Sequence, residues 1–575
     1  MYKKLLLSVA VMANCISTNA QTLAPDYKGN GYNNPISANV FCADPTALEY
    51  NGRLYVYGTN DSQEFVANGK TGGNSYGKIK SLVVFSTDDM VNWTFHGTID
   101  VQKICSWSGC SWAPSAVWRT HPLTHKDEFL IYFANGGSNV GVLKSTTSPV
   151  GPFKSPNSQA MVNHGMPGVD PCTSLFDPGA VIDENGVGWI TVGGYSPNAQ
   201  GNRLQPNNVS ILKLKPSMTA VDGTAVKIQA PYHFEANELN MIGGKYVFTY
   251  CSHWDRDVTE WNTYKNEHNI SAEMPGGGTM CYMVSDNPLD ANSWVYKDYY
   301  GPGVAGNNHT HLQKFQGKYY HIYHDHGDIL LNVMKNAGVV DANAGDYRSI
   351  CVNQATVNES TATINRVTLN HEGVTQIKNL NPYEWQQAET MASCGGIDYE
   401  DFTNIQKNTS INTLGNDASE NMQVKMKPGS WINVRGVDFG TNGAAKFTLR
   451  AKGTGTMKIC TSRVIPQPIV TIDFSSTEME EQIFDIPADK LKGVKNNLYF
   501  CVTDATDFYV DAWQFTEAAP SGIQEVSNGQ MVKQQRYDLL GRQLSDANNH
   551  RGIVIEQYTD ENGVKHCRKV LSGKE

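Results

Sequence analysis

Four potentially reactive side chains precede a recurring sequence pattern at nearly the same distance. The pattern is a short aromatic and β-branched segment that begins at residues 53, 128, 187, 245 and 318. Asp44 and His309 lie nine residues before such a start, and Asp177 and Glu235 lie ten residues before one. If the five segments are equivalent strands of one fold, these side chains meet at one end of it.

Three carboxylates in one site favour acid–base chemistry. Burial and mutual repulsion raise the pKa of at least one carboxyl, so that an acid and a base coexist near neutral pH. Glycosidic hydrolysis needs such a pair. A lone Asp-Pro is more typical of a turn and a lone Glu of a solvated strand, but the shared offset favours the functional interpretation. Glu238 is a rival acid, yet it lies three residues from Glu235, so the two face opposite sides of a strand.

Proline follows both aspartates, in Asp44-Pro45 and Asp177-Pro178. The residue before a proline is restricted, so the sequence predicts an extended backbone that aims each carboxylate. The second segment lacks a carboxylate, and Trp112-Ala113-Pro114 stands near the equivalent place.

The elements that must position these residues are strands. Each recurring segment is rich in residues that favour β-structure, most follow a turn such as Asn51-Gly52 or Gln316-Gly317, and hardly any helical periodicity lies between them. Five repeats of this size predict an all-β fold, a five-bladed β-propeller of four-stranded blades over residues 21–378. An all-β sandwich whose strands merely look alike is the alternative.

The remaining chain predicts two further parts. Alternating strands between Tyr383 and Phe515 predict a β-sandwich (jelly-roll) domain over residues 379–517. Residues 518–575 are expected to be a linker and a short tail. Residues 1–20, with two lysines, an apolar core and Thr18-Asn19-Ala20, are typical of a signal peptide.

Composition excludes some classes of protein. The 575 residues carry a net charge of −10 without a basic block, which argues against nucleic-acid binding. After the first 20 residues no apolar run is long enough for a membrane helix. Cys105 and Cys110 are candidates to close a short loop, and no cysteine–histidine spacing typical of zinc is present.

Several motifs, in order along residues 30–375, resemble glycoside hydrolase family 43. They are Asn34-Pro35, Ala43-Asp44-Pro45, Ser111-Trp112-Ala113-Pro114, Leu175-Phe176-Asp177-Pro178, Phe234-Glu235-Ala236 and Gly306-Asn307-Asn308-His309. Within the family the chain is most similar to arabinoxylan arabinofuranohydrolases, on Tyr55-Val56-Tyr57-Gly58-Thr59-Asn60-Asp61, Val91-Asn92-Trp93-Thr94 and Tyr250-Cys251-Ser252.

The resemblance implies a five-bladed propeller and an inverting mechanism without an organic cofactor. Asp44 would be the general base, Glu235 the general acid, and Asp177 the residue that orients the acid and tunes its pKa. Inversion implies acid and base carboxyls roughly 6.5–9.5 Å apart. Of the other residues, Trp112 would wall the sugar pocket, Asn307, Asn308 and His309 would line its floor, and Arg348 would hydrogen-bond the sugar. His309 is also a candidate for holding calcium in the channel, although Thr310 stands where close relatives often carry a second histidine.

The second domain resembles carbohydrate-binding module family 6, on Ala388-Glu389-Thr390, Gly429-Ser430-Trp431-Ile432, Val437-Asp438-Phe439-Gly440 and Val510-Asp511-Ala512-Trp513-Gln514-Phe515. The resemblance implies that Glu389 and Asp511 hold a structural calcium ion and that Trp431 is an aromatic platform for a sugar, with ordinary packing as the alternative for Trp431. Gln387 stands where an acid is more usual, and Tyr509 where many members carry a sugar-binding Asn.

The tail resembles the C-terminal sorting domain of type IX secretion, on Arg536-Tyr537-Asp538-Leu539-Leu540-Gly541-Arg542, Gly552-Ile553-Val554-Ile555 and Lys569-Val570-Leu571. With the signal peptide it implies a secreted or cell-surface protein. The alternative is a small additional β-hairpin module.

The expected function is removal of α-L-arabinofuranosyl side chains from arabinoxylan or a related xylan. A β-xylosidase, or an enzyme with both activities, would use the same three carboxylates. An alternative of another class is a non-catalytic surface glycan-binding protein. The presence of both Asp44 and Glu235 favours an enzyme.

Overall fold

The structure is a computed structural model of the chain. It describes residues 22–29, 31–68, 71–170, 172, 174–194, 203–304, 306–406, 417–463, 467–487, 489–519, 533–544, 552–559 and 565–572. The chain divides into two compact units, Met1–Thr516 and Glu517–Glu575. The predicted signal peptide, residues 1–20, lies outside the described residues.

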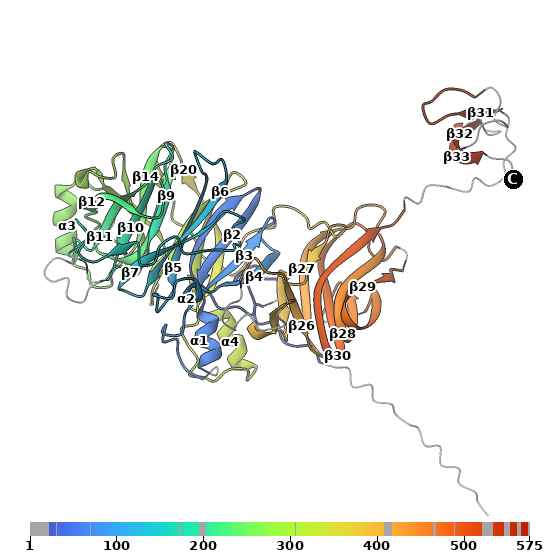
Figure 1. Cartoon of the computed structure of the whole chain (residues 1–575), viewed down its shortest axis with the longest axis horizontal. Helices are drawn as coiled ribbons and strands as arrows, with labels where there is room; N and C mark the ends of the chain where they lie inside the picture. The colour runs from blue at the N-terminus through green and yellow to red at the C-terminus, as the bar shows by residue number, and fades with distance from the viewer. Residues whose placement is uncertain are drawn as a thin grey trace, which may run out of the picture. The chain divides into compact units, whose positions relative to one another are not determined.

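Five antiparallel sheets follow one another along the first unit (Figure 1). Sheet 1 contains β1 (Ala43–Tyr50), β2 (Arg53–Thr59), β3 (Leu82–Thr87) and β4 (Trp93–Ile99). Sheet 2 contains β5 (Trp112–Thr120), β6 (Asp127–Asn135), β7 (Asn139–Ser145) and β8 (Val162–Asn163). Sheet 3 contains β9 (Gly179–Ile182), β10 (Gly188–Gly193), β11 (Val209–Leu214) and β12 (Val221–Lys227). Sheet 4 contains β13 (His233–Ile242), β14 (Lys245–Ser252), β15 (Met280–Ser285) and β16 (Val295–Gly301). Sheet 5 contains β17 (Thr310–Phe315), β18 (Lys318–Asp325) and β19 (Ser349–Ala355).

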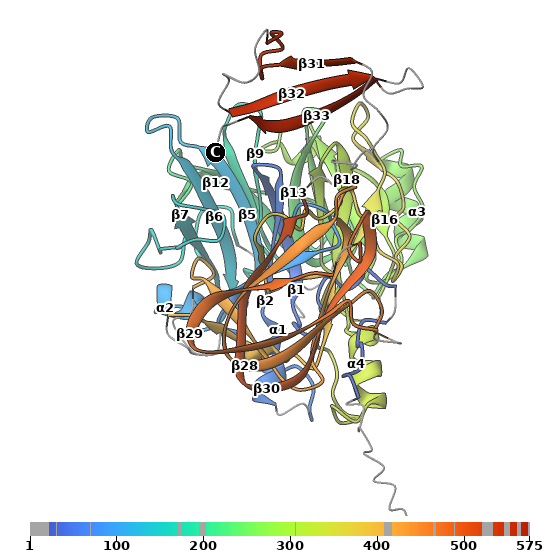
Figure 2. The same cartoon turned by 90° about the vertical axis from the view of Figure 1, so that its right-hand side faces the viewer.

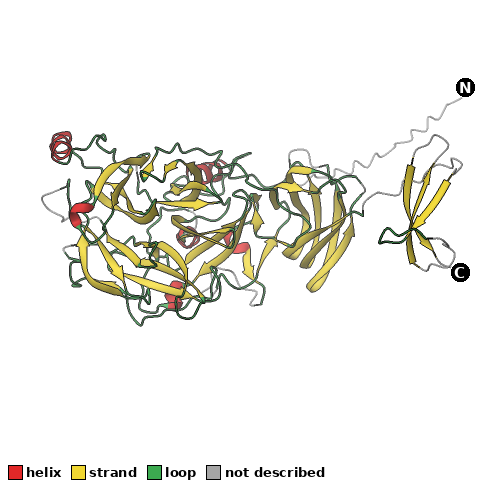
Figure 3. Ribbon diagram, turned by 90° about the horizontal axis from the view of Figure 1, so that it is seen from above, coloured by secondary structure: helices red, strands yellow, loops and turns green. Residues whose placement is uncertain are grey.

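These five sheets close into a ring. The first strands of neighbouring sheets contact each other in the order β1, β5, β9, β13 and β17, and β17 contacts β1 again. The recurring segments of the sequence are the second strands, β2, β6, β10, β14 and β18. An offset of nine or ten residues therefore leads back to the beginning of each first strand, where the candidate side chains lie. Strands dominate the chain (Figure 3), and the all-β prediction is confirmed.

Apolar side chains fill the spaces between neighbouring sheets. Leu82 and Val84 of sheet 1 pack with Phe129 and Ile131 of sheet 2, and comparable clusters lie between sheets 2 and 3, 3 and 4, and 4 and 5. Each fully buried side chain of this size contributes about 1.5–3 kcal/mol through the hydrophobic effect. The first strands are therefore held firmly at the centre of the ring.

The helices and short elements are insertions between the strands. They are α1 (Asp61–Ala67), α2 (Val101–Ile104), α3 (Val258–Glu267), the 3₁₀ turn Ala291–Ser293, α4 (Asp328–Asn336), and the small hairpin of β20 (Val357–Asn358) and β21 (Thr363–Ile364). The insertions with α1 and α4 pack together through Phe65, Leu330, Leu331 and Tyr347. Both helices lie at the same end of the ring (Figures 1 and 2).

A further sheet, sheet 6, follows the ring. Its strands are β22 (Gln386–Gln387), β24 (Ser393–Gly395), β25 (Phe402–Asn404), β26 (Met422–Met426), β27 (Trp431–Asp438), β28 (Ala444–Cys460), β29 (Val470–Asp485) and β30 (Val494–Glu517), with the 3₁₀ turn Tyr399–Asp401 before β25. The strand between β22 and β24, β23 (Thr390–Met391), pairs instead with β4 of sheet 1. One hydrophobic core joins Phe85 and Phe95 of sheet 1 to Phe402 and Ile432 of sheet 6.

An N-terminal segment also ties the first unit together. The backbone N–H of Ala24 donates to the Gly429 carbonyl at 2.9 Å. Lys28 is fully buried, and its Nζ donates to the Ala392 carbonyl at 2.8 Å. The segment of residues 22–28 therefore packs against sheet 6.

The second unit is a small antiparallel sheet of β31 (Lys533–Tyr537), β32 (Gly552–Thr559) and β33 (Lys565–Ser572), in which Glu556 pairs with Arg536 and Arg568. In the part of the chain that the structure describes, every cysteine is a free thiol, including Cys105 and Cys110, the candidate pair for a short loop. No helix in that part is long and apolar enough to cross a membrane.

Candidate active site

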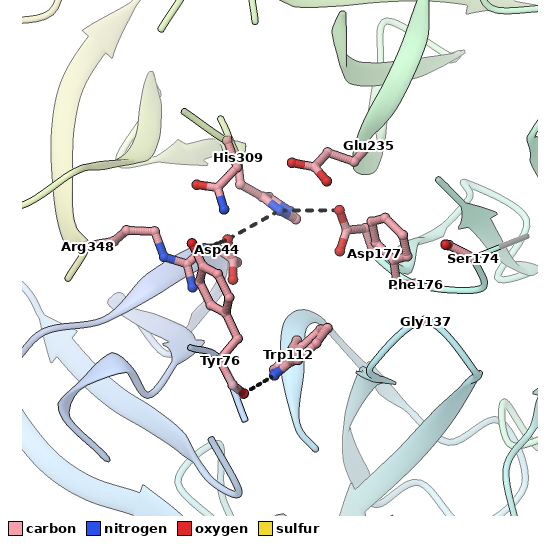
Figure 4. A pocket seen from close by; sticks show the side chains of 11 residues that line it. Asp44, Tyr76, Trp112, Gly137, Ser174, Phe176, Asp177, Glu235, His309 and Arg348 are labelled. Carbon is pink, nitrogen blue, oxygen red and sulfur yellow. Dashed lines mark hydrogen bonds and ion pairs between the residues drawn. The ribbon is translucent and has the colours of Figure 1, made fainter. Parts of the chain in front are cut away.

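A pocket of about 310 Å³ opens where the first strands of the ring begin (Figure 4). Every sheet of the ring, or a loop attached to it, contributes to its wall. The lining residues are Asp44, Tyr76, Trp112, Gly137, Ser174, Phe176, Asp177, Glu235, Asn307, His309 and Arg348.

The pocket contains most of the residues singled out in the ring from the sequence. The three carboxylates, Trp112, Asn307, His309 and Arg348 all line it. Asn308 does not; its Nδ2 donates to the carbonyls of Gly278 at 2.8 Å and Pro302 at 3.2 Å, so it holds the neighbouring loops together. The rival Glu238 is buried away from the pocket, where its Oε1 lies 2.9 Å from Nδ1 of His311.

The backbone at both aspartates differs from the expectation. Asp44 and Asp177 each have φ of 48°, and Ala113 has φ of 40°. The extended conformation expected before proline is therefore wrong at these positions. Residues other than glycine rarely adopt this left-handed backbone conformation, because it strains the backbone. Such strain persists only where the surrounding structure enforces it. Ala113 shows that sheet 2 makes the same turn as sheets 1 and 3 without a carboxylate.

Arg348 controls the charge of Asp44. Its Nη1 donates to Asp44 Oδ1 at 2.8 Å, while Nε and Nη2 each donate to Asp61 at 2.9 Å. Burial alone would raise the pKa of Asp44, but Arg348, with His324 and His309, outweighs burial and holds this pKa well below its ordinary range. Asp44 is thus an ionised carboxylate at neutral pH.

The surroundings of Glu235 and Asp177 have the opposite effect on pKa. Burial, followed by repulsion from Asp44, raises the pKa of Asp177 to about 8. Burial, followed by repulsion from Asp177 and Asp44, raises the pKa of Glu235 well above its ordinary range. The backbone N–H of Ala236 donates to Asp177 Oδ2 at 2.8 Å, which favours the ionised form of Asp177. Glu235 is therefore protonated at neutral pH.

His309 lies between the aspartates, with Nδ1 3.7 Å from Asp44 Oδ1 and 3.9 Å from Asp177 Oδ2 (Figure 4). Burial lowers its pKa to about 4, so the ring is neutral at neutral pH. Among the described residues, no group of three or more His, Cys, Asp or Glu side chains is arranged to hold a metal ion.

The sequence analysis missed several residues of the site. Tyr76 accepts a hydrogen bond on its carbonyl from Trp112 Nε1 at 3.1 Å, and Arg348 lies 5.1 Å from the centroid of its ring. Asp61 and His324 hold Arg348 and Asp44 from outside the pocket. Asp61 ends the motif that begins at Tyr55, and His324 lies in the recurring segment that begins at residue 318. Only the folded chain shows which residues they contact.

The residues predicted to bind a sugar in the second domain lie apart from this pocket. Trp431 is fully buried: its Nε1 donates to the Ala24 carbonyl at 2.8 Å, and Tyr499 and Arg463 pack against its ring. The platform interpretation is therefore corrected, because no face of the indole is free for a sugar. Tyr509 lines a separate groove, with Lys425 and Lys452 at 5.4 and 4.9 Å from its ring centroid.

The predicted calcium ligands are neighbours: Asp511 lies in β30 of sheet 6, and Glu389 lies between β22 and β23. Burial raises the pKa of Glu389 to about 8, and the nearby Asp511 adds to this effect. Asp511 bonds Arg450 and Asn421. Two buried oxygens beside this group, Gln387 Oε1 and Glu389 Oε2, make no hydrogen bond within the described residues.

Comparisons with known proteins agree with the geometry of the pocket. Residues 32–324 match the model of glycosyl hydrolases family 43. The chain is 31% identical over 542 residues to an arabinoxylan arabinofuranohydrolase of Paenibacillus polymyxa, which covers 89% of this chain and 78% of that protein. It is 32% identical over 539 residues to the arabinoxylan arabinofuranohydrolase of Bacillus subtilis (strain 168), which covers 89% and 97%.

A solved structure is similar over nearly the same length. It is a family 43 arabinoxylan arabinofuranohydrolase from Bacillus subtilis in complex with cellotetraose. The TM-score is 0.72 at 30% identity, with 86% of this chain and 99% of that chain covered. The chain belongs to glycoside hydrolase family 43.

Proposed function

We propose that the protein is an inverting hydrolase that removes α-L-arabinofuranosyl side chains from arabinoxylan. The observation that carries the mechanism is the opposite surroundings of two carboxyls in one pocket. Arg348 contacts Asp44 and lowers its pKa, whereas burial beside Asp177 raises the pKa of Glu235. Two relatives with the name arabinoxylan arabinofuranohydrolase support the substrate.

The proposed reaction needs only water and the three carboxylates. Asp44 removes a proton from a water molecule, whose oxygen attacks the anomeric carbon. Glu235 gives its proton to the glycosidic oxygen as the bond to the anomeric carbon breaks. Asp177, which is fixed by the Ala236 N–H, keeps Glu235 protonated until this step. Arg348 holds Asp44 in place and ionised, a role added to the predicted contact with the sugar.

The dimensions of the pocket support attack at a chain end or side branch. About 310 Å³ is at the lower limit of typical ligand pockets and suits a single sugar residue. Trp112 and Tyr76 wall one side. A long polysaccharide backbone does not thread through so small a space, so the backbone stays outside.

The test is the sugar released from wheat arabinoxylan and, in parallel, from linear xylan, with Glu235→Gln as the matched inactive variant. Arabinose from the first and nothing from the second would support the proposal. Xylose from linear xylan would replace it with the β-xylosidase or dual activity. No sugar from either substrate, together with binding to xylan, would favour a non-catalytic glycan-binding protein.

We also propose the finer architecture implied by the family resemblances. The five sheets closed into a ring would be the blades of a five-bladed propeller, and sheet 6 would be a jelly-roll sandwich of carbohydrate-binding module family 6. The ring contacts between first strands support the former. For sheet 6, the support is its sequence motifs, and its sugar-binding role would have to use a surface other than Trp431.

A structural calcium ion is proposed for sheet 6, held by Glu389 and Asp511 with Gln387. The two buried oxygens without partners support it, since a cation would satisfy both. Its effect would be on stability: calcium should raise the unfolding temperature, and Glu389→Gln should abolish that increase. A calcium ion beside His309 in the ring is a separate proposal, supported only by the family resemblance.

Export is proposed from residues 1–20 and the tail, which would place the enzyme outside the cell or on its surface. Fractionation of cells that express the full chain, compared with a chain truncated after residue 517, tests the proposal. Retention of both proteins inside the cell would contradict it.

A further inference from the structure

A buried asparagine of sheet 4 holds the backbone of Asp177 in its strained conformation. Asn237 of β13 donates from Nδ2 to the carbonyl of Asp177 at 2.9 Å and to the carbonyl of Gly193 at 2.6 Å. The N–H of Gly193, at the end of β10, donates to the carbonyl of Phe176 at 3.1 Å. The planar peptide groups on both sides of the Asp177 Cα atom are therefore hydrogen-bonded. Because φ and ψ describe how these two groups turn about Cα, the contacts fix the φ of 48°.

A histidine fixes the orientation of Asn237 in turn. Oδ1 of Asn237 lies 2.7 Å from Nε2 of His233, and Nδ1 of the same ring lies 2.8 Å from the side-chain amide of Asn208. Burial lowers the pKa of His233 to about 4, so the ring is neutral at neutral pH. The amide nitrogen of Asn237 already donates to two carbonyls, so its oxygen must accept, and the hydrogen of the imidazole is on Nε2. We call Asn237, His233 and Asn208 the positioning network.

The positioning network is enclosed by the ring. Asn237 is fully buried, and His233 and Asn208 are 2% and 3% exposed. The imidazole packs against Phe248 and Tyr250, with centroids 6.0 and 5.4 Å away. Among the described residues that line the pocket, none belongs to the network. The network therefore influences the reaction through the residue that it holds.

That residue is the neighbour of the general acid. Glu235, Ala236 and Asn237 are consecutive in β13. Glu235 lines the pocket with Asp177 (Figure 4), whose charge helps to raise its pKa. The Ala236 N–H donates to Asp177 Oδ2 at 2.8 Å, and Asn237 binds the Asp177 carbonyl. Three consecutive residues of one strand thus fix the carboxylate and the backbone of Asp177 relative to the acid.

The strained turns at Asp44 and Ala113 are held from other sheets. The N–H of Asp44 donates to Nδ1 of His324, in sheet 5, at 3.1 Å. The N–H of Ala113 donates to Oγ1 of Thr59, in sheet 1, at 2.8 Å. At Asp177 the residue that binds the turn stands instead on the strand that carries the acid. A displacement of that strand would therefore move the acid and Asp177 together.

We propose that Asn237, oriented by His233, is a positioning residue of the reaction: it places the Asp177 carboxylate beside Glu235 and so makes Glu235 an effective proton donor. The inference rests on the proposed function, in which Glu235 is the acid. Without the Asn237 contact, Asp177 would relax from its strained turn, and Glu235 would protonate a glycosidic oxygen less well. The other walls of the sugar pocket would stay as they are.

The first test compares Asn237→Ala with the unaltered enzyme on two substrates. On arabinoxylan, whose leaving group must be protonated, we expect kcat/KM to fall on the order of 10²-fold, mainly through kcat. On an aryl α-L-arabinofuranoside, whose leaving group needs little protonation, the fall should be within about threefold. A merely structural role would lower both rates equally. Equal losses on the two substrates, or no loss on either, would overturn the proposal.

The histidine offers a conservative rescue in case Asn237→Ala folds poorly. His233→Gln keeps a nitrogen donor for Asn237 and should stay within about threefold of the unaltered enzyme on arabinoxylan, whereas His233→Leu should reproduce the selective loss. Asn240→Ala is the matched control: this asparagine of the same strand has an Nδ2 that makes no hydrogen bond within the described residues. It should leave both substrates unaffected. Equal activity of the Gln and Leu variants would contradict the role of His233.

A double-mutant cycle tests whether Asn237 acts through Asp177. Once Asp177→Asn has removed the carboxylate, adding Asn237→Ala should lower kcat/KM on arabinoxylan by less than about threefold, because the group that Asn237 positions is already gone. A further loss as large as that of Asn237→Ala alone would show that Asn237 acts elsewhere.

A crystal structure of Asn237→Ala separates the positioning from the proposed reaction, since it needs no hydrolysis. We expect φ of Asp177 to leave the left-handed region, or the distance from Ala236 N to Asp177 Oδ2 to exceed about 3.5 Å. An unmoved Asp177 would overturn the positioning even if arabinose is released. If Asp177 moves but the unaltered protein releases no arabinose, the proposed function fails and the positioning survives.

Discussion

Trp112 in the ring and Trp431 beside sheet 6 are the same residue type in two regions, with opposite surroundings. Trp112 faces a pocket of about 310 Å³ together with three carboxylates. Trp431 is fully buried beneath the segment that carries Ala24. Both use the indole N–H in the same way, as a donor to a backbone carbonyl.

The two tryptophans differ in the space around the indole ring. At the pocket, the backbone has a positive φ at Asp44, Ala113 and Asp177, and a space of about 310 Å³ lies in front of the side chains. At Trp431 the space is filled, because Leu23, Tyr499 and two cysteines pack around the ring. An aromatic residue in a carbohydrate-active protein is therefore a candidate binding residue only where the surrounding backbone leaves a face exposed.

The largest effect is expected from the carboxylates. Asp44→Ala should lower kcat on every substrate by on the order of 10³, as loss of a catalytic base does. Glu235→Ala should match this loss on arabinoxylan but lose far less on an aryl arabinofuranoside, whose leaving group needs little protonation. Steady-state kinetics on both substrates measure the contrast. An Asp44→Ala variant with ordinary activity would remove the base from its role.

Exchange of the two tryptophans for alanine should separate activity from stability. Trp431→Ala should cost about 3–5 kcal/mol of unfolding free energy, as expected for a large buried ring. Trp112→Ala should cost far less stability and reduce kcat/KM instead. Denaturant unfolding and initial rates check both. If Trp431→Ala remained stable and bound polysaccharide more weakly, the platform interpretation would return.

The pH dependence sharpens the account of the pocket. The charge of Asp177 helps to raise the pKa of Glu235. Asp177→Asn removes this charge, so the pKa of Glu235 falls and the acid loses its proton at a lower pH. The alkaline limb of kcat/KM against pH should therefore move to lower pH. Glu238→Gln is the matched control, since Glu238 is paired with His311 away from the pocket; a shift toward higher pH in Asp177→Asn would contradict the assignment.

The smallest effect is expected in the groove of sheet 6. Two lysines already contact the ring of Tyr509, so its faces are poorly available to a sugar. Tyr509→Ala should change retardation in an arabinoxylan gel by less than about twofold. A much larger loss of retardation would move the main polymer contact from the ring to sheet 6.

The three carboxylates of the pocket were predictable from the sequence because the strand pattern of the ring repeats. Each first strand begins at a fixed distance before an apolar second strand, so Asp44, Asp177 and Glu235 were identifiable by counting. The loops were not predictable in this way. Tyr76 and Arg348 belong to insertions around α1 and α4, and their approach depends on packing between segments about 270 residues apart.

Two misjudged positions have the same physical origin. The strained φ at Asp44 runs against the local preference of a residue before proline, and the ring as a whole enforces it. The burial of Trp431 depends on Ala24, which is 407 residues away in the chain. Local patterns identify residue types and spacing, whereas distant segments decide whether a side chain meets solvent, a ligand or another part of the protein.

The pairing of β23 with β4 has a consequence for how such proteins evolve. Two parts joined only by a flexible linker could be exchanged independently. Here one part lends a strand to a sheet of the other, and a single apolar core runs through both. Recombination between them would break hydrogen bonds and expose that core in both fragments. We therefore expect the two parts to fold, and to be inherited, as one unit.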